Sequence, residues 1–76
     1  MMVEIYGTKQ CGYCKQAVSI CEVHKVEYNY IDVGNSTSLQ LLTERMGTRP
    51  RTVPQIFIDG EYLPGGFVGL SQKLDK

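Results

Sequence analysis

The stretch that decides the fold of this chain reads Val3-Glu4-Ile5-Tyr6, then four residues, then Cys11-Gly12-Tyr13-Cys14. The apolar run is typical of a buried strand, and the cysteine pair opens a helix-like segment over residues 13–24. Two cysteines separated by two residues at the start of a helix can join as a disulfide within one turn. Unpaired N–H groups and the positive end of the helix dipole stabilise the thiolate of the first cysteine, which is the form that attacks disulfides. These residues alone therefore indicate thiol–disulfide chemistry, with Cys11 as the nucleophile.

The spacing of apolar residues predicts three helices. The first buries a face whose members follow helical periodicity, namely Cys14, Ala17, Val18 and Cys21. Lys25 is expected near its end, where a cation suits the negative pole. Thr37 with Gln40 resembles a capping box that starts the second helix, and Gly47 is a typical stop. The apolar residues of the second and third helices are Leu39, Leu42, Met46, Phe67, Leu70 and Leu74.

Strand signals alternate with these helices. Residues 27–33 alternate in polarity and are rich in strand formers, and Gln55–Ile58 is an apolar run. Asp59-Gly60 is a two-residue hairpin signal that leads into Glu61–Leu63. The helical crossover implies parallel pairing and the hairpin implies antiparallel pairing. The sequence therefore predicts an α/β fold of order β-α-β-α-β-β-α, a four-stranded mixed sheet flanked by three helices, as one domain over residues 1–76.

Composition excludes several classes of function. The chain has 76 residues, with 8 Lys and Arg against 8 Asp and Glu, so there is no basic field to gather nucleic acid or to hold a membrane surface. Its apolar runs are far shorter than the roughly 20 residues that span a bilayer. The N-terminus lacks the pattern of a signal peptide. Three cysteines, two of them close together, suit a reducing compartment, so we expect a cytoplasmic monomer.

A zinc half-site is the main alternative for the cysteine pair, because the spacing C-x2-C-x6-C-x2-H ends at His24. A tetrahedral site needs four ligands. On a continuous helix, however, Cys14 and Cys21 lie roughly 10 Å apart along the axis, which is too far to share one ion. No metal site is therefore expected. Cys21 is expected to be a small buried residue of the core, and His24 a polar residue at the helix end.

Three separated signatures occur in order along the chain. They are the strand that leads into Cys11-Gly12-Tyr13-Cys14, the segment Thr52-Val53-Pro54-Gln55-Ile56-Phe57-Ile58-Asp59, and Gly65-Gly66 before the last helix. Over essentially the whole chain they resemble a glutaredoxin of the dithiol C-x-x-C type, in the thioredoxin-fold superfamily. The second signature is similar to the cis-proline loop of that family. A lone C-x-x-C is a weak signal, but the three together are highly specific.

The resemblance implies a glutathione-dependent oxidoreductase that reduces protein disulfides and protein–glutathione mixed disulfides. Cys11 would attack the disulfide, and Cys14 would resolve a protein-bound intermediate. Glutathione would be the co-substrate, with no permanent cofactor. The Val53–Pro54 bond is expected to be cis. The glutathione-binding residues that the resemblance implies are Lys9, Tyr13, Thr52, Val53, Pro54, Gly65, Gly66, Phe67 and Val68.

The chain departs from the family pattern at three places. Many members have an acidic residue shortly after the Gly-Gly pair to meet the γ-glutamyl amine, but Phe67-Val68-Gly69 stands there. Lys9 lies two residues ahead of the first cysteine rather than three, and Gly12 replaces the commoner proline. We therefore expect weakened glutathione binding, which Gly69→Asp should strengthen. One of three arginines near the Thr52 loop is expected to meet a glutathione carboxylate: Arg45, Arg49 or Arg51.

Two other functions stay open. The chain could be a dedicated electron donor to ribonucleotide reductase that is itself reduced by a thioredoxin reductase, which weak glutathione contacts would favour. Alternatively, some glutaredoxins with a small residue in place of the motif proline hold a [2Fe–2S] cluster between two protomers. They use the first cysteine and glutathione for this, and Gly12 permits the same here.

Overall fold

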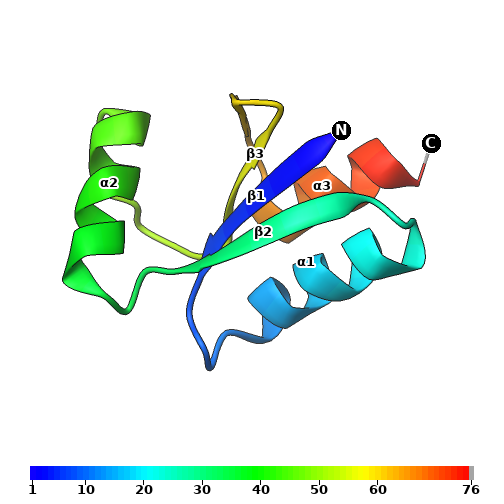
Figure 1. Cartoon of the computed structure of the whole chain (residues 1–76), viewed down its shortest axis with the longest axis horizontal. Coiled ribbons are helices and arrows are strands. Elements are labelled where there is room, and N and C mark those ends of the chain that lie inside the picture. Colours follow the sequence, from blue (N-terminus) through cyan, green and yellow to red (C-terminus); the bar gives the residue numbers. More distant parts are fainter. Residues whose placement is uncertain (76) are drawn as a thin grey trace.

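The computed structural model describes residues 1–75, which form a four-stranded sheet and three helices (Figure 1). In chain order the elements are β1 (Met2–Gly7), α1 (Gly12–Val23), β2 (Glu27–Asp32), α2 (Ser36–Met46), β3 (Gln55–Ile58), β4 (Glu61–Leu63) and α3 (Gly66–Leu74). This is the predicted order of elements. The domain predicted over residues 1–76 includes Lys76, which lies outside the described residues.

The strand β1 lies in the interior of the sheet, whose order is β2-β1-β3-β4. It runs parallel to β2, with Ile5 opposite Tyr30, and antiparallel to β3, with Ile5 opposite Ile56. A hairpin joins β3 to β4, and its residues Asp59 and Gly60 have φ angles of 50° and 86°. Positive φ at both positions is what a two-residue hairpin of this kind requires. The predicted mixed sheet and its hairpin are confirmed.

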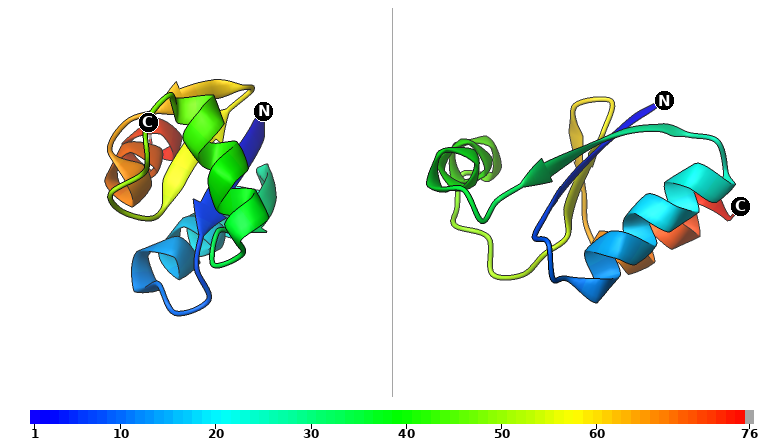
Figure 2. Two further views of the ribbon diagram at one scale, coloured as in Figure 1. Left: turned by 90° about the vertical axis from the view of Figure 1, so that its left-hand side faces the viewer. Right: turned by 60° about the horizontal axis from the view of Figure 1, so that its bottom comes forward.

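The sheet separates two apolar clusters. Successive side chains of a strand point to opposite faces, so the buried residues of β1 contribute to both clusters. The helices α1 and α3 lie side by side on one face, and α2 stands on the other (Figures 1 and 2). The buried residues of the first cluster are Val3, Ile5, Ala17, Cys21, Ile56 and Leu70. Those of the second cluster are Tyr6, Val33, Leu42 and Phe57.

Small side chains allow α1 to lie close to the sheet. Cys14, Ala17 and Cys21 are fully buried and Val18 is half-buried, which confirms the predicted inner face of the helix. Lys25 is the second residue beyond the helix rather than part of its last turn. Lys25 has a φ of 56° and lies in the turn that leads into β2.

The start of α2 differs from the prediction. The N-cap is Asn35, whose side-chain oxygen accepts a hydrogen bond from the Thr37 backbone N–H at 2.8 Å. Thr37 already lies inside the helix, so the capping box predicted at Thr37 and Gln40 is wrong. The short amide of Asn35 satisfies an N–H of the first turn, which is the usual function of an N-cap. Gly47 ends the helix in the left-handed conformation, with a φ of 76°, as predicted.

Two side chains of α2, Leu42 and Arg45, contribute to its attachment to the sheet. Leu42 is fully buried against the second apolar cluster. Arg45 donates hydrogen bonds to both carboxylate oxygens of Glu4, at 2.8 and 2.9 Å, and to the Tyr6 hydroxyl at 3.0 Å. Its guanidinium lies 3.9 Å from the centre of the Phe57 ring. One arginine therefore connects α2 to both β1 and β3.

Arg45→Met should lower the free energy of unfolding by about 1 kcal/mol at neutral pH, because a bidentate ion pair and a cation–π contact are lost. The hydrogen bond from Arg45 is the main cause that lowers the pKa of the Glu4 carboxyl. A carboxyl with a depressed folded pKa stabilises the fold above its unfolded pKa, and this contribution disappears as the pH falls through the folded value. Urea denaturation should therefore show a difference between wild type and variant that shrinks below about pH 4.

The matched control is Arg49→Met, since Arg49 is an exposed arginine on the segment that follows α2. It should change the unfolding free energy by less than about 0.5 kcal/mol. Equal destabilisation by the two substitutions would contradict the assignment of Arg45 as the connection between α2 and the sheet.

Candidate functional site

Cys11 lies at the start of α1, as predicted. It is the N-cap residue, in an extended conformation, and its Sγ accepts a hydrogen bond from the Cys14 backbone N–H at 3.2 Å. Its thiol also donates to the carbonyl oxygen of Val53, with an Sγ–O distance of 3.6 Å. The side chain is half-buried. The helix start thus faces the sulfur, and the loop before β3 contacts it.

Cys14 lies one turn further along the helix and is fully buried. Burial, together with the neighbouring Cys11 thiol, raises the pKa of Cys14 to about 11. It therefore remains a protonated thiol at neutral pH. Cys21 is also fully buried, and burial raises its pKa as well. The three cysteines are unpaired in this structure. Because Cys14 and Cys21 are buried, Cys11 is the thiol within reach of a substrate.

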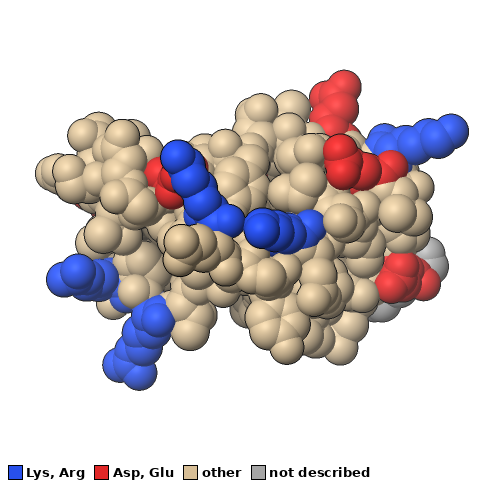
Figure 3. All heavy atoms as spheres, turned by 90° about the horizontal axis from the view of Figure 1, so that it is seen from below, with Lys and Arg blue, Asp and Glu red and all other residues tan. Residues whose placement is uncertain are grey.

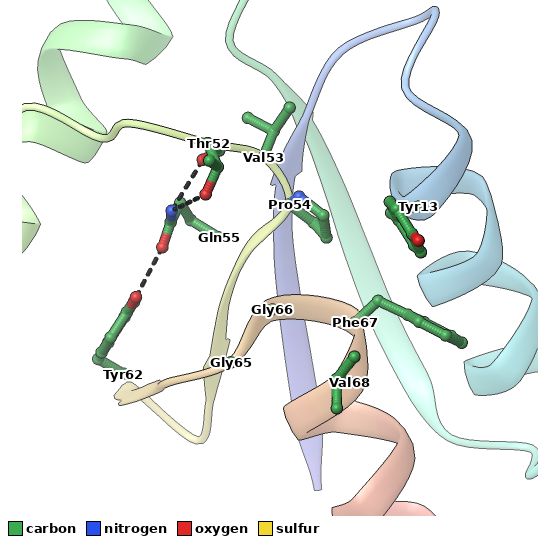
Figure 4. A pocket seen from close by; sticks show the side chains of 10 residues that line it. All are labelled: Tyr13, Thr52, Val53, Pro54, Gln55, Tyr62, Gly65, Gly66, Phe67 and Val68. Atoms are coloured by element: carbon green, nitrogen blue, oxygen red, sulfur yellow. Dashed lines mark hydrogen bonds between the residues drawn. The ribbon is translucent and has the colours of Figure 1, made fainter.

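An open cleft of about 250 Å³ lies between the start of α1, the loop before β3 and the start of α3 (Figure 4). The Val53–Pro54 peptide bond at this cleft is cis, as expected. The rings of Tyr13 and Phe67, from the two helices, approach to 6.1 Å between centroids. The predicted binding residues that line the cleft are Tyr13, Thr52, Val53, Pro54, Gly65, Gly66, Phe67 and Val68.

Two residues of the cleft were missing from the prediction. Gln55, the first residue of β3, is buried, and its Nε2 donates to the Thr52 carbonyl oxygen at 2.7 Å. The Tyr62 hydroxyl in turn donates to Oε1 of Gln55 at 2.7 Å. These bonds hold the Thr52 loop against the β3–β4 hairpin (Figure 4). A glutamine that opens an apolar strand was the available signal, because a buried amide needs partners.

The predicted basic residues are not among those that line the cleft. Lys9 lines surface hollows on the other side of its loop, next to Thr8. The guanidinium of Arg45 binds Glu4, so the expectation that Arg45 could meet a glutathione carboxylate is wrong. Arg49 and Arg51 are exposed. Figure 3 shows Lys and Arg side chains gathered over the left and centre of the lower face, with acidic side chains mainly to the right.

Comparison with known proteins identifies the family. A model of the glutaredoxin family matches residues 3–63. The chain belongs to the glutaredoxin family. It is 35% identical over 71 residues to the glutaredoxin of Haemophilus influenzae, which covers 86% of this chain and 82% of that protein. It is 34% identical over 64 residues to glutaredoxin 3 of Escherichia coli, which covers 83% of this chain and 75% of that protein.

Solved glutaredoxins have the same architecture. The reduced glutaredoxin of Escherichia coli superposes with a TM-score of 0.78 at 27% identity, over 99% of this chain and 94% of that one. Glutaredoxin 1 of Francisella tularensis, solved with cacodylate, gives 0.77 at 29% identity, over 97% and 92%. The thioredoxin fold is confirmed. Family membership and the Cys11–Cys14 pair make this chain a thiol–disulfide oxidoreductase.

Cys21, which the zinc alternative requires as a ligand, is packed in the first apolar cluster. Among residues 1–75, no three His, Cys, Asp or Glu side chains come together as metal ligands would. His24 instead pairs through Nε2 with Oδ1 of Asp75 at 2.9 Å, which connects the ends of α1 and α3. Within the same residues, no helix is long and apolar enough to cross a membrane.

Two glycines beside the cysteines have opposite surroundings. A Cβ on Gly7, the last residue of β1, would lie 2.5 Å from the Cys14 Sγ and 2.6 Å from the Tyr30 hydroxyl oxygen. A Cβ on Gly12, the first residue of α1, would meet no atom within 4 Å. A residue without a side chain is therefore required at position 7 to leave space for Cys14, whereas glycine is not sterically required at position 12.

Gly7→Ala should lower the free energy of unfolding by about 1–3 kcal/mol, because the new methyl group displaces Cys14 or Tyr30. Gly12→Ala is the matched control and should be neutral or stabilising by up to about 1 kcal/mol, since alanine favours the helix. Urea denaturation of both variants measures the difference. A stable Gly7→Ala variant with unchanged dithiol activity would contradict the steric requirement for glycine at this position.

Proposed function

We propose that this chain is a glutathione-dependent oxidoreductase that reduces protein disulfides and protein–glutathione mixed disulfides, with Cys11 as nucleophile and Cys14 as resolving thiol. The asymmetry of the two thiols is the observation that carries the proposal. Cys11 caps α1 beside the cleft, whereas Cys14 is fully buried with its pKa raised to about 11. One thiol is therefore suited to attack from outside, and the other to act only once a partner is attached.

The reaction proceeds through thiolate exchange. The Cys11 thiolate attacks one sulfur of the substrate disulfide, a Cys11–substrate bond forms, and the other sulfur leaves as a thiolate that takes up a proton. Cys14 then loses its proton and attacks the Cys11 sulfur, which releases the second substrate thiol and leaves a Cys11–Cys14 disulfide. Two glutathione molecules return the pair to the dithiol and leave as glutathione disulfide.

Glutathione is the co-substrate that the family uses, and the cleft offers it two kinds of contact. The backbone of Val53 beside Pro54 can pair with an extended peptide, and main-chain hydrogen bonds are indifferent to side-chain identity. The start of α3, whose N-cap Gly65 provides no side-chain hydrogen bond, presents N–H groups to a carboxylate. We therefore assign the peptide backbone to Val53 and the γ-glutamyl carboxylate to the start of α3.

The γ-glutamyl amine lacks a charged partner among the cleft residues at the start of α3. The substitution expected to restore it, Gly69→Asp, is incompatible with the packing, because a Cβ on Gly69 would run into the carbonyl oxygen of Pro64. Val68 offers the better position, since it lines the cleft and is 58% exposed. A carboxylate there would stay hydrated and would stand at the mouth of the proposed site.

Val68→Asp should lower the Michaelis constant for glutathione mixed disulfides about tenfold or more, because a charge-assisted hydrogen bond is worth roughly 1.5–3 kcal/mol. Steady-state kinetics with glutathione and its reductase measure the change. Val23→Asp, on an exposed valine of α1, adds the same charge elsewhere and should leave the constant within about twofold. An unchanged Michaelis constant in Val68→Asp would contradict the placement of the γ-glutamyl amine beside Val68.

Cys14→Ser should separate the two reactions of the site. Reduction of a glutathione mixed disulfide needs only Cys11, because a second glutathione resolves the intermediate. Reduction of a protein disulfide depends on intramolecular attack by Cys14 at high effective concentration. The variant should keep the first activity and lose most of the second, whereas Cys21→Ala should keep both. Loss of both activities in a folded Cys14→Ser variant would show that Cys14 does more than resolve.

The missing charge also favours a second candidate, an electron donor to ribonucleotide reductase that is reduced by a thioredoxin reductase. Comparing glutathione plus its reductase with thioredoxin reductase as the electron supply distinguishes the two. Faster turnover with thioredoxin reductase would favour the second candidate. A dithiol that must be regenerated is suited to a reducing compartment, and we place either activity in the cytoplasm.

A further inference from the structure

The hydroxyl of Tyr30 lies near the Cys14 sulfur, and Tyr30 is not among the residues that line the cleft. Tyr30 belongs to β2, and its hydroxyl donates to the carbonyl oxygen of Thr8 at 2.6 Å. This bond crosses from β2 to the loop that follows β1. The ring is partly exposed and borders a surface hollow between α1 and β2, which Val18 and Ser19 also line.

The absent side chain of Gly7 creates the space in which Tyr30 and Cys14 come together. The Tyr30 oxygen and the Cys14 Sγ lie 2.6 and 2.5 Å from the single point that a Cβ on Gly7 would occupy. The two groups therefore approach each other over the end of β1 from β2 and from α1. Cys14 is fully buried, so the phenol provides a polar neighbour that water does not.

The electrostatics of this pair fit a donor that stays protonated. Burial and the neighbouring Cys14 raise the pKa of Tyr30 to about 12. Burial is the main cause that raises the pKa of Cys14, and the Tyr30 hydroxyl acts in the opposite direction. Two further titratable groups act on the pair: Cys11, on the helix of Cys14, and Asp32, at the end of β2. Two cationic side chains, Lys9 and Lys15, border the same hollow as Tyr30.

We propose that Tyr30 is a positioning residue for the resolving step, whose hydroxyl turns from the Thr8 carbonyl to the Cys14 sulfur when that sulfur becomes a thiolate. This inference rests on the proposed function, because it concerns the thiol that resolves the mixed disulfide. A hydrogen bond to a thiolate in a buried site stabilises it by the equivalent of about tenfold or more in an equilibrium constant. Tyr30 thereby assists the thiol that burial otherwise holds protonated.

The step balances without a further reactant. With Cys11 joined to the substrate, Cys14 releases its proton, which passes to the bulk solvent. The Cys14 thiolate attacks the Cys11 sulfur, the Cys11–Cys14 bond forms and the Cys11–substrate bond breaks. The substrate sulfur leaves with the bonding electron pair and takes up a proton from water. Tyr30 donates a hydrogen bond and keeps its own proton throughout.

The test is stopped-flow reaction of the reduced protein with the chromogenic disulfide dithiobis(nitrobenzoate). Attack by Cys11 releases a first nitrothiolate, and resolution by Cys14 releases a second, so the two steps appear as separate phases. Tyr30→Phe should lower the rate of the second phase relative to the first about tenfold. The pH at which the second phase reaches half its maximal rate should rise by about one unit.

Tyr28→Phe is the matched control, since Tyr28 lies two residues earlier on the same strand and its hydroxyl donates to Glu22 instead. It should leave the ratio of the two phases and the pH midpoint unchanged. Equal slowing of both phases by Tyr30→Phe would overturn the proposal, because it would indicate disturbance of the Thr8 loop alone. Unchanged phases would overturn it as well.

These outcomes are separate from the outcome for the proposed function. A parent protein without glutathione-linked turnover would refute the proposed function, yet both phases with the chromogenic disulfide would remain measurable. A parent with full turnover and a Tyr30→Phe variant with an unchanged second phase would refute only the inference about Tyr30.

Discussion

The small side chains on the inner face of α1 allow the helix to lie against β1, with its first turn directly behind the end of the strand. Cys14 occupies the space above Gly7, and Ala17 and Cys21 continue the contact along the helix. A larger residue at any of these positions would move the helix away from the sheet. The position of the Cys11 sulfur at the start of α1 is a consequence of this packing.

The cleft depends on the same contact. Its walls come from three segments that are far apart in the sequence, and they meet because β1 pairs with β3 while α1 packs beside α3. The carbonyl of Val53 reaches the Cys11 sulfur across this junction. Gln55 and Tyr62 then fix the Thr52 loop from behind, so the binding surface stands on the sheet and is not a freely mobile loop.

Most of this architecture could be predicted, because its causes are local. The turn at Asp59-Gly60, the stop at Gly47 and the inner face of α1 each follow from residue type and spacing. The prediction failed where the outcome depended on three-dimensional neighbours. The sequence does not show that Pro64 closes the space above Gly69, or that Arg45 of α2 reaches Glu4 of β1. The choice of Asn35 over Thr37 as N-cap was a competition between two good candidates.

The three thiols differ in burial, so their reactivity toward a label reports on local unfolding of the chain. Cys11 is partly accessible in the folded state, whereas Cys14 and Cys21 are fully buried. A bulky thiol reagent can therefore modify Cys14 and Cys21 only after α1 has separated from the sheet. Because Cys21 is fully buried in the first apolar cluster, the rate at which it becomes labelled follows the local unfolding equilibrium of the helix that carries it. Chemistry and stability can thus be followed separately in one molecule, without any added probe residue.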